Sequence, residues 1–197
     1  MLLKNVDVSK TDTKDVNIRP FKIWDFILLN KTYDELSEET KKYFHPGFLG
    51  FKEYNLIGQI KLAISSFRFI QKILKKILPK FLILSLIAFL NKEIAGFAFL
   101  EFKQKVKIGF STKFSAHFGI FVVEKYQNMG IGTLLMSEIL KVAKINDVGE
   151  ITLTVLSDNL KAIRLYKKFG FECAGETTDK WKEKEFPSKI MKLKLNF

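Results

Sequence analysis

The sequence predicts an α/β fold, or α+β in schemes that separate the two classes, in which a single domain holds one mixed central β-sheet flanked by helices. Three observations lead to this prediction. The chain has 197 residues, of which 47% are hydrophobic and 20 are phenylalanine, enough for one sizeable core. Apolar runs of strand length alternate with segments of helical period. A buried strand, an amphipathic helix and a second buried strand also follow one another, which is the order of a parallel crossover.

The N-terminal part begins with a polar stretch, residues 1–14, which we expect to be a flexible lead-in. Residues 15–20 alternate apolar and polar side chains, as a first strand does. A helix follows, predicted from the spacing of Trp24, Ile27, Leu28 and Leu29. Ser37, followed by acidic residues, predicts the start of a further helix. The His-Pro pair at 45–46 ends that helix, and we expect His45 to cap it or to lie on the surface.

Asn55 to Leu78 has the pattern of one basic amphipathic helix, within an insert at about 50–80. Its apolar face consists of Ile60, Ala63, Ile64, Phe67, Ile70, Leu74, Ile77 and Leu78. Its polar face consists of Lys61, Ser65, Arg68, Lys72, Lys75 and Lys76. Three interpretations stay open: the apolar face packs on the sheet and the lysines are solvated, the helix is a lid over a substrate site, or it makes a weak contact with an anionic membrane surface.

Two apolar runs, residues 81–90 and 94–102, surround the turn Asn91-Lys92-Glu93 and predict a long hairpin. Gly96 in the second run indicates a bulge. The polar residues between 103 and 114 predict a connection or a ragged edge strand.

Residues 117–123 form a near-continuous apolar run, typical of a strand buried on both faces. After a short polar turn, the apolar positions from Gly130 onward take on helical spacing. Gly130 and Gly132 fall in the first turn of this helix, where several backbone N–H groups lack partners. Two interpretations remain at this point. The glycines either let a phosphate group approach the N–H groups, or let the helix pack tightly on the strand.

The remaining elements are a strand at 150–156, a helix capped by Ser157-Asp158-Asn159 that ends before Gly170, and two final antiparallel strands around a loop with Trp181. The strand at 150–156 should lie parallel to the one before it, because a single helix joins the two.

The block around the two glycines resembles the signature of the GNAT superfamily of acyl-CoA N-acyltransferases. That signature is Gln or Arg, two residues, Gly, one residue, and Gly or Ala, and Gln127, Gly130 and Gly132 match it as QNMGIG. Downstream, NLKAIRLYKKFGF resembles the family's second block in the expected order. The resemblance is specific over about 116–171, looser over 17–46 and absent over 47–80.

This resemblance implies one N-acetyltransferase domain over residues 1–197, with acetyl-CoA as cosubstrate and a primary amine of a small molecule or protein as acceptor. The amine would attack directly in a ternary complex. In the family, backbone groups of the split strand hold the pantetheine arm, the glycine turn holds the pyrophosphate, and an asparagine bonds the arm. The residues that match these roles are Phe121, Val122, Val123, Gln127, Asn128, Met129, Gly130, Ile131, Gly132, Thr133 and Asn159.

The resemblance also implies two catalytic residues. Tyr166 matches the tyrosine that protonates the leaving CoA thiolate, and it lies two helical turns after Asn159, on the same face. His117 stands where many relatives have a glutamate that acts as the general base, and a histidine can also take a proton from the amine at neutral pH. These two residues and Asn159 also have structural alternatives: Tyr166 as a packing aromatic, Asn159 as a helix cap and His117 as a core or surface histidine.

Composition limits the remaining functions. One cysteine, Cys173, excludes an internal disulfide framework, and two histidines with one cysteine are too few for a His/Cys zinc site, so we propose no metal. No secretory or membrane-spanning segment is visible, so we expect a cytoplasmic monomer or homodimer. The net charge of +12 favours anionic partners and argues against a polyamine acceptor. Nucleic acid is not expected, because the phenylalanines lie in core-like runs. A CoA-binding sensor or scaffold without activity is the alternative function.

Overall fold

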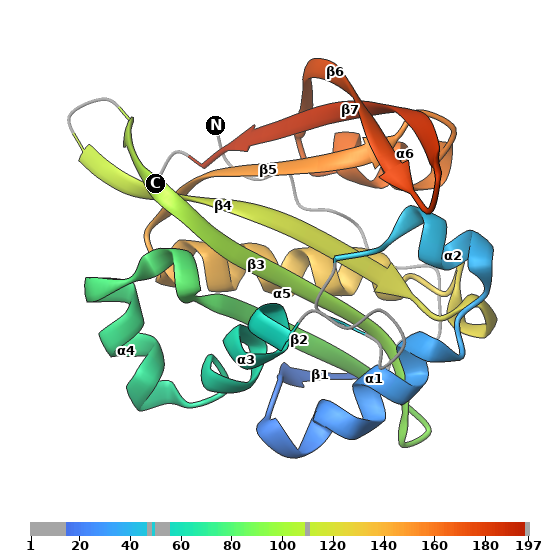
Figure 1. Ribbon diagram of the computed structural model, residues 1–197, viewed down its shortest axis with the longest axis horizontal. Helices are drawn as coiled ribbons and strands as arrows, with labels where there is room; N and C mark the ends of the chain where they lie inside the picture. The colour runs from blue at the N-terminus through green and yellow to red at the C-terminus, as the bar shows by residue number, and fades with distance from the viewer. Residues whose placement is uncertain (1–14, 47–48, 50–55, 109–110, 196–197) are drawn as a thin grey trace.

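The computed structural model describes residues 15–46, 49, 56–108 and 111–195, and the predicted lead-in and residues 50–55 of the insert lie outside this part. Figure 1 shows one central sheet with helices on both sides. The strands are β1 (Asn17–Pro20), β2 (Ile83–Leu90), β3 (Glu93–Ile108), β4 (Ser111–Val122), β5 (Val148–Leu156), β6 (Glu172–Trp181) and β7 (Lys184–Lys194). The helices are α1 (Phe26–Asp34), α2 (Glu38–Tyr43), α3 (Leu56–Ile64), α4 (Arg68–Ile77), α5 (Ile131–Ile145) and α6 (Leu160–Lys168).

The seven strands lie in the order β1-β2-β3-β4-β5-β7-β6, so the predicted mixed sheet is confirmed. β4 and β5 are parallel because α5 alone connects them, and the other neighbouring strands are antiparallel. β7 lies between β5 and β6, which makes β6 the edge strand at one end.

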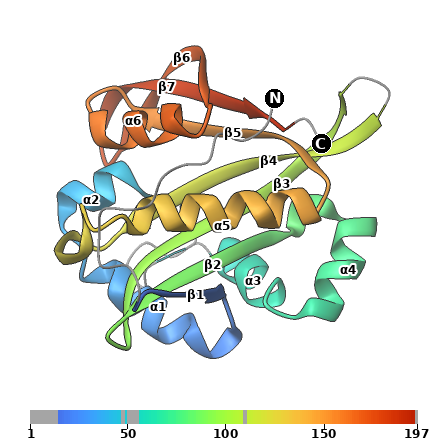
Figure 2. The ribbon, with the colours of Figure 1, turned by 180° about the vertical axis from the view of Figure 1, so that it is seen from behind.

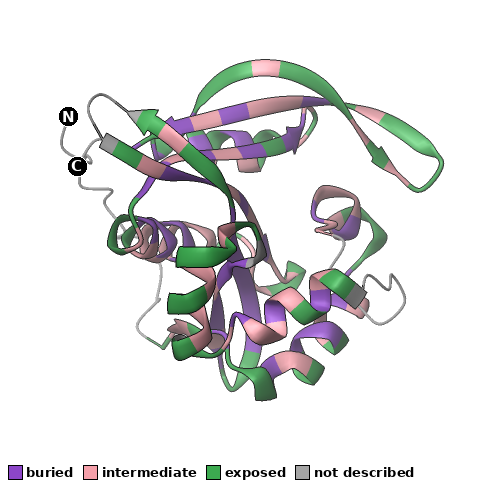
Figure 3. Ribbon diagram, turned by 60° about the vertical axis from the view of Figure 1, so that its left-hand side comes forward, coloured by how far each residue is buried: buried purple, intermediate pink, exposed green. Residues whose placement is uncertain are grey.

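Each face of the sheet carries its own apolar core. On one face, the buried side of α5, including Leu135 and Ile139, packs with residues of α6 such as Ile163. On the other face, Leu29 and Tyr33 of α1 and Leu62 of α3 pack over the phenylalanines of β3 and β4. Figure 2 shows α5 in front of the strands when the molecule is seen from behind. Buried residues concentrate along the central strands, whereas the β6–β7 hairpin is largely exposed (Figure 3).

The buried face of α1 differs from the predicted one. Leu29 is fully buried as expected, but Trp24, Ile27 and Leu28 are 70%, 71% and 43% exposed. Trp24 lies in a preceding 3₁₀ turn and the α-helix begins only at Phe26. The buried stripe therefore runs through Leu29 and Tyr33, whose hydroxyl donates to the Phe44 carbonyl at 3.1 Å.

The prediction of a single helix from Asn55 to Leu78 was wrong, because the structure has two helices, α3 and α4, separated at 65–67. Ser65 is buried at this break, and its Oγ accepts a hydrogen bond from the Ile83 N–H of β2 at 3.0 Å. Ser66 Oγ donates to the Ala63 carbonyl at 2.7 Å. Serine side chains that bond to backbone groups in this way compete with helix propagation, and the chain turns between the two helices.

The predicted hairpin at 81–102 is confirmed as β2 and β3. Its turn is only two residues long, since Asn91 and Lys92 both have positive φ (52° and 66°) and Glu93 already belongs to β3. The bulge also occurs, as a register shift opposite Ala95, next to Gly96. The polar stretch 103–114 was expected to be a connection or edge strand. It instead extends a hairpin, in which residues 105–108 of β3 pair with 111–114 of β4.

The predicted caps are present. Ser37 Oγ accepts from the Thr40 N–H at the start of α2, and Gly170, with φ 88°, follows α6. Among the described residues no helix has both the length and the apolar character that crossing a bilayer requires.

Candidate functional site

The strands β4 and β5 separate at the centre of the molecule. Their parallel pairing runs from Phe114 with Val148 to His117 with Thr152 and ends there. β4 continues to Val122 and β5 to Leu156, so both strands extend beyond the last pair. A sheet that stops pairing between two interior strands leaves backbone N–H and C=O groups available to a ligand.

The register of β4 identifies which groups face this gap. The Val123 N–H donates to the Ala95 carbonyl at 2.9 Å, so the peptide groups of Val123 and Phe121 are directed to β3. Hydrogen-bonding direction alternates along a strand, and Ile120 and Val122 therefore direct their peptide groups toward β5, where pairing has ended. Of the three residues assigned to the pantetheine arm from the sequence, only Val122 faces the gap. The peptide groups of Ile120, which the sequence analysis did not name, also face the gap, because the register of β4 is not visible in the sequence.

The turn after β4 leads directly to the start of α5. The Gln127 side chain folds back, and its Nε2 donates to the Val122 carbonyl at 3.2 Å. Asn128 and Gly130 both have positive φ, 63° and 80°, and Gly130 is the N-cap residue. The first intrahelical bond at this end runs from the Leu134 N–H to the Gly130 carbonyl. The N–H groups of Ile131, Gly132 and Thr133 thus form the open end of a 15-residue helix, where the helix dipole favours an anion.

The space around Gly132 shows whether a glycine is needed for packing at the N-terminus of α5. A Cβ at Gly132 would lie 3.4 Å from a Leu165 methyl and 3.8 Å from a Val122 methyl, both ordinary contacts. Packing within the protein therefore does not require glycine here, in contrast to Gly96, where a Cβ would lie 2.8 Å from the Phe121 carbonyl oxygen. Glycine in a helix is less stable than alanine. A group that approaches the backbone from outside explains Gly132 better than tight helix packing does.

Asn159 is the N-cap of α6. Its Oδ1 accepts a hydrogen bond from the Ala162 N–H at 3.1 Å, so the capping alternative is what the structure shows for this oxygen. A further bond to a ligand would have to come from the amide nitrogen, because the oxygen already serves the helix.

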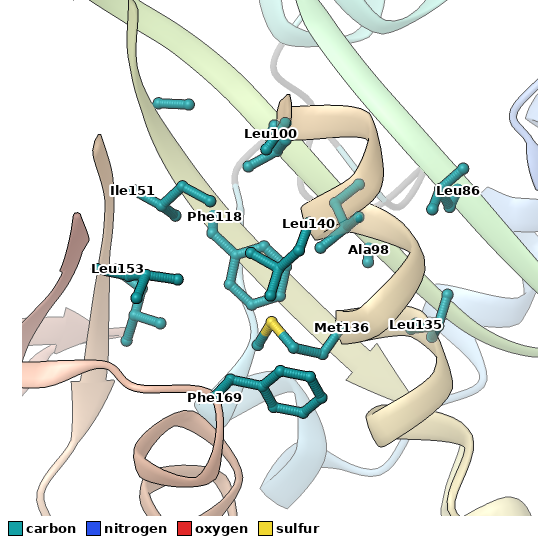
Figure 4. Packing of buried hydrophobic residues seen from close by; sticks show 14 of the residues in the cluster. Leu86, Ala98, Leu100, Phe118, Leu135, Met136, Leu140, Ile151, Leu153 and Phe169 are labelled. Atoms are coloured by element: carbon teal, nitrogen blue, oxygen red, sulfur yellow. The ribbon is translucent and has the colours of Figure 1, made fainter. Parts of the chain in front are cut away.

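Tyr166 lies on α6 and is 94% buried, with its ring edge-on to Phe118 at a centroid distance of 6.2 Å. Phe118 is the first β4 residue beyond the last paired position, and Figure 4 shows its ring directed toward Met136 and Phe169. Burial raises the pKa of Tyr166 above its ordinary value of 10. Its hydroxyl has no partner in the described part of the chain, where every fully buried side-chain polar atom has one, so the hydroxyl oxygen keeps an accessible side.

His117 lies on the opposite face of the sheet, because side chains alternate along β4. It pairs with Glu101 of β3 and is half-buried. Burial lowers the pKa of His117 below its ordinary value of 6.5, and the nearby charge of Lys103 lowers it further, while Glu101 and Asp179 act in the other direction. Glu101 itself bonds to Lys103 at 2.7 Å and to Lys61 of α3 at 3.5 Å.

The helix α2 lies across the open ends of β4 and β5, a feature that the sequence analysis missed. Glu124, just after β4, accepts from the Ser37 N–H at 2.9 Å, and Lys42 bonds to Asp158, just after β5, at 2.9 Å. At the other end of α2, His45 Nδ1 is 3.0 Å from the Lys42 carbonyl, as expected for a cap.

The same end of α2 contacts the β6–β7 hairpin. The His45 ring lies 5.0 Å from the Trp181 ring, and its Nε2 is 3.5 Å from Asp179. These contacts join residues far apart in the chain, so no local sequence pattern could predict them.

No three His, Cys, Asp or Glu side chains within the described ranges gather closely enough to hold a metal ion.

Comparisons with known proteins are consistent with this geometry. The sequence model of the acetyltransferase (GNAT) family matches residues 21–171. The chain is 33% identical over 91 residues to L-amino acid N-acetyltransferase AaaT of Escherichia coli, which covers 46% of this chain and 54% of that protein. It is 35% identical over 57 residues to spermine/spermidine N(1)-acetyltransferase of Bacillus subtilis, covering 28% and 38%. The chain thus spans about half or less of these relatives.

A structural comparison covers nearly the whole chain. The fold is similar to that of Arabidopsis thaliana NAA60 in complex with acetyl-CoA, with a TM-score of 0.65 and 17% identity over 91% of this chain and 99% of that one.

Proposed function

The chain belongs to the acetyltransferase (GNAT) family, and from this premise we propose that it transfers an acetyl group from acetyl-CoA to a primary amine by direct attack in a ternary complex. The observation that carries the proposal is the separation of β4 and β5 beyond His117 and Thr152, with the open end of α5 beside it. A thioester arm fits between two unpaired strands, and a diphosphate fits the N-terminus of a helix.

The proposed cosubstrate site uses backbone groups on both sides of the turn. The peptide groups of Ile120 and Val122 would bond the amides of the pantetheine arm, as a β-strand bonds its neighbour. The N–H groups of Ile131, Gly132 and Thr133 would bond the pyrophosphate. Gln127 would act on the shape of the turn through its bond to Val122 rather than on the phosphate itself.

Tyr166 is the proposed general acid. Its raised pKa keeps the phenol protonated at neutral pH, so it can donate a hydrogen bond and then a proton to the sulfur that leaves the acetyl group. The same burial that raises the pKa of the phenol also disfavours a thiolate beside it, and this increases the demand for a donor at that point.

His117 is the proposed general base. Its lowered pKa leaves the imidazole neutral at pH 7, which is the form that accepts a proton from an ammonium group of pKa near 10. Tyr166 and His117 lie on opposite faces of the sheet, at the place where the pairing of β4 with β5 ends. The amine would thus lose its proton on one face while sulfur gains one from the other.

The acceptor would lie on the His117 face, bordered by α3 through the Lys61 to Glu101 pair and by the β6–β7 hairpin through Asp179. The relatives named above act on L-amino acids and on spermine or spermidine, so both classes belong among the candidates. The high positive charge of this chain favours an acceptor with a carboxylate over a polycation.

The test is an acceptor panel with acetyl-CoA in which released thiol is measured, run in parallel on wild type and Tyr166→Phe. The panel contains L-amino acids, polyamines, a peptide N-terminus and an amino sugar. We expect turnover with at least one amine and a fall of about 10²–10⁴-fold in kcat for Tyr166→Phe, the usual range for a lost general acid. CoA affinity, measured by calorimetry, should change little because the ring and its packing remain.

Undiminished turnover in Tyr166→Phe would remove the assigned acid. Tight CoA binding without turnover on any acceptor would instead favour a CoA-binding module without activity.

A further inference from the structure

The described part of the insert at about 50–80 has many large apolar side chains exposed to solvent. Within residues 57–78, seven large apolar residues are at least 40% exposed: Ile57, Ile60, Phe67, Phe69, Ile73, Ile77 and Leu78. Four of them, Ile60, Phe67, Ile77 and Leu78, belong to the apolar face predicted from the sequence, whereas Ile57, Phe69 and Ile73 do not. Large apolar residues that lie exposed side by side mark a binding surface when they form a patch.

On α4 two apolar stripes run side by side. The inner stripe includes Leu74, which packs against the core on the α5 side. The outer stripe consists of Phe69, Ile73 and Ile77, one helical turn apart, with exposed fractions of 75%, 40% and 67%. Leu74 attaches the helix to the domain, whereas the outer stripe lies exposed among the described residues. Figure 3, in which the left side of Figure 1 comes forward, shows exposed turns on this helix.

The charged residues of the chain segment that contains the outer stripe are all basic. Residues 54–92 contain no Asp or Glu and seven basic residues: Lys61, Arg68, Lys72, Lys75, Lys76, Lys80 and Lys92. Lys72 and Lys76 are exposed, one turn apart, and form no ion pair with any described residue. Lys75 differs, since it bonds to Asp147 at 3.1 Å and thereby ties α4 to the end of α5.

We infer that the outer stripe of α4, Phe69, Ile73 and Ile77 with Lys72 and Lys76, docks on an anionic phospholipid surface. A short helix with an apolar stripe and lysines beside it matches the interface of an anionic bilayer, where the apolar groups enter the headgroup region and the lysines meet phosphates. A second copy of the chain fits less well, because a two-fold interface through this stripe would bring the lysines of one copy close to those of the other, with like charge. This inference is independent of the acetyl transfer proposed above.

Vesicle flotation of the full chain tests the inference. Vesicles of phosphatidylcholine alone are compared with vesicles containing 30% phosphatidylserine, at low and high salt. We expect wild type to bind the anionic vesicles and to release them at high salt. Lys72→Gln/Lys76→Gln should weaken this binding about 30-fold, and Phe69→Ser/Ile77→Ser at least tenfold.

Matched controls lie at the C-terminal end of α5, outside the outer stripe of α4. Lys141→Gln/Lys144→Gln removes the same charge, and Ile145→Ser removes an apolar side chain that is 78% exposed. Both controls should bind anionic vesicles like wild type, and CoA affinity should be unchanged in all variants.

Three results would overturn the inference: equal binding to neutral vesicles, equal loss in the α5 controls, or no binding at all. Sedimentation that shows a dimer broken by Phe69→Ser/Ile77→Ser would assign the surface to self-association instead.

Discussion

At the residue scale, His117 and Tyr166 are set apart by the alternation of one strand. Tyr166 packs on Phe118, and His117, the neighbouring residue of β4, points to the other face. His117 is the last residue of β4 that pairs with β5, and Phe118 is the first one beyond it. Their environments also move the two pKa values apart, since burial raises that of the phenol and lowers that of the imidazole. At pH 7 this leaves the proposed acid protonated and the proposed base unprotonated.

The pH dependence follows from the lowered pKa of His117. As pH falls through that pKa, below the ordinary value of 6.5, the imidazole gains a proton and kcat/KM should fall. His117→Gln should reduce kcat/KM at pH 7 by about 10²–10⁴-fold and remove this acidic limb, with recovery at high pH as the amine deprotonates unaided. The measurement is a pH profile of kcat/KM.

Lys103→Gln is the matched control. Lys103 lowers the pKa of His117, so its removal should move the acidic limb to higher pH without lowering the plateau. A profile in His117→Gln that keeps the wild-type limb would return His117 to a packing role. The free energy of unfolding should change with pH in the same direction. As pH falls below about 6.5, His117 gains a proton in the unfolded chain before it does in the native state, so the native state should become less stable.

At the element scale, the N-terminus of α5 is the central part of the proposed cosubstrate site. Gly132→Ala should raise stability by up to about 1 kcal/mol, because alanine has the higher helix propensity and its Cβ meets only ordinary contacts. The same Cβ should weaken CoA binding at least tenfold if phosphate approaches this N–H, and Gly132→Glu should abolish binding by adding bulk and negative charge. Denaturant melts and calorimetry measure the two effects.

Gly96→Ala separates packing from ligand approach. Its Cβ would lie 2.8 Å from the Phe121 carbonyl oxygen and 3.0 Å from a Leu135 methyl, so we expect a loss of about 1–3 kcal/mol in stability.

Unchanged CoA affinity in a folded Gly132→Glu protein would refute the proposed phosphate site.

At the scale of the whole molecule, the sheet consists of two parts, one made of β1 to β4 and one made of β5, β7 and β6. Among the described residues, the two parts are joined by a single ladder, the short parallel pairing from Phe114 to His117. The helix α2 spans the open ends through Glu124 and Asp158. A ligand held between β4 and β5 would contact both parts and should raise the apparent stability of the whole domain.

We therefore expect acetyl-CoA at 100 times its Kd to stabilise the protein by about 2.7 kcal/mol, a rise in Tm of about 5–10 °C for a chain of this size. Differential scanning fluorimetry measures this, with an equal charge concentration of duplex DNA as the control. An equal or larger shift with DNA would contradict acetyl-CoA as the ligand and favour nucleic acid.

The sequence by itself determined the features that depend on neighbouring residues. Hydrophobic period, caps and glycines predicted the hairpin at 81–102, the strand-turn-helix around Gly130, and the capped helix from Asn159 to Gly170. These features are local because a period of two or 3.6 and a cap need only a few adjacent residues. The order of elements around the crossover then required β4 and β5 to be parallel.

Only the tertiary structure decided the features that depend on contacts between distant residues. The break between α3 and α4 depends on Ser65 meeting Ile83, and the position of α2 depends on Ser37 meeting Glu124. The choice of Ile120 and Val122 for the gap depends on the register of β4 against β3. Burial works in the same way: Phe69 and Ile77 have the helical spacing of core residues, but whether such a stripe is covered depends on which other elements pack against it.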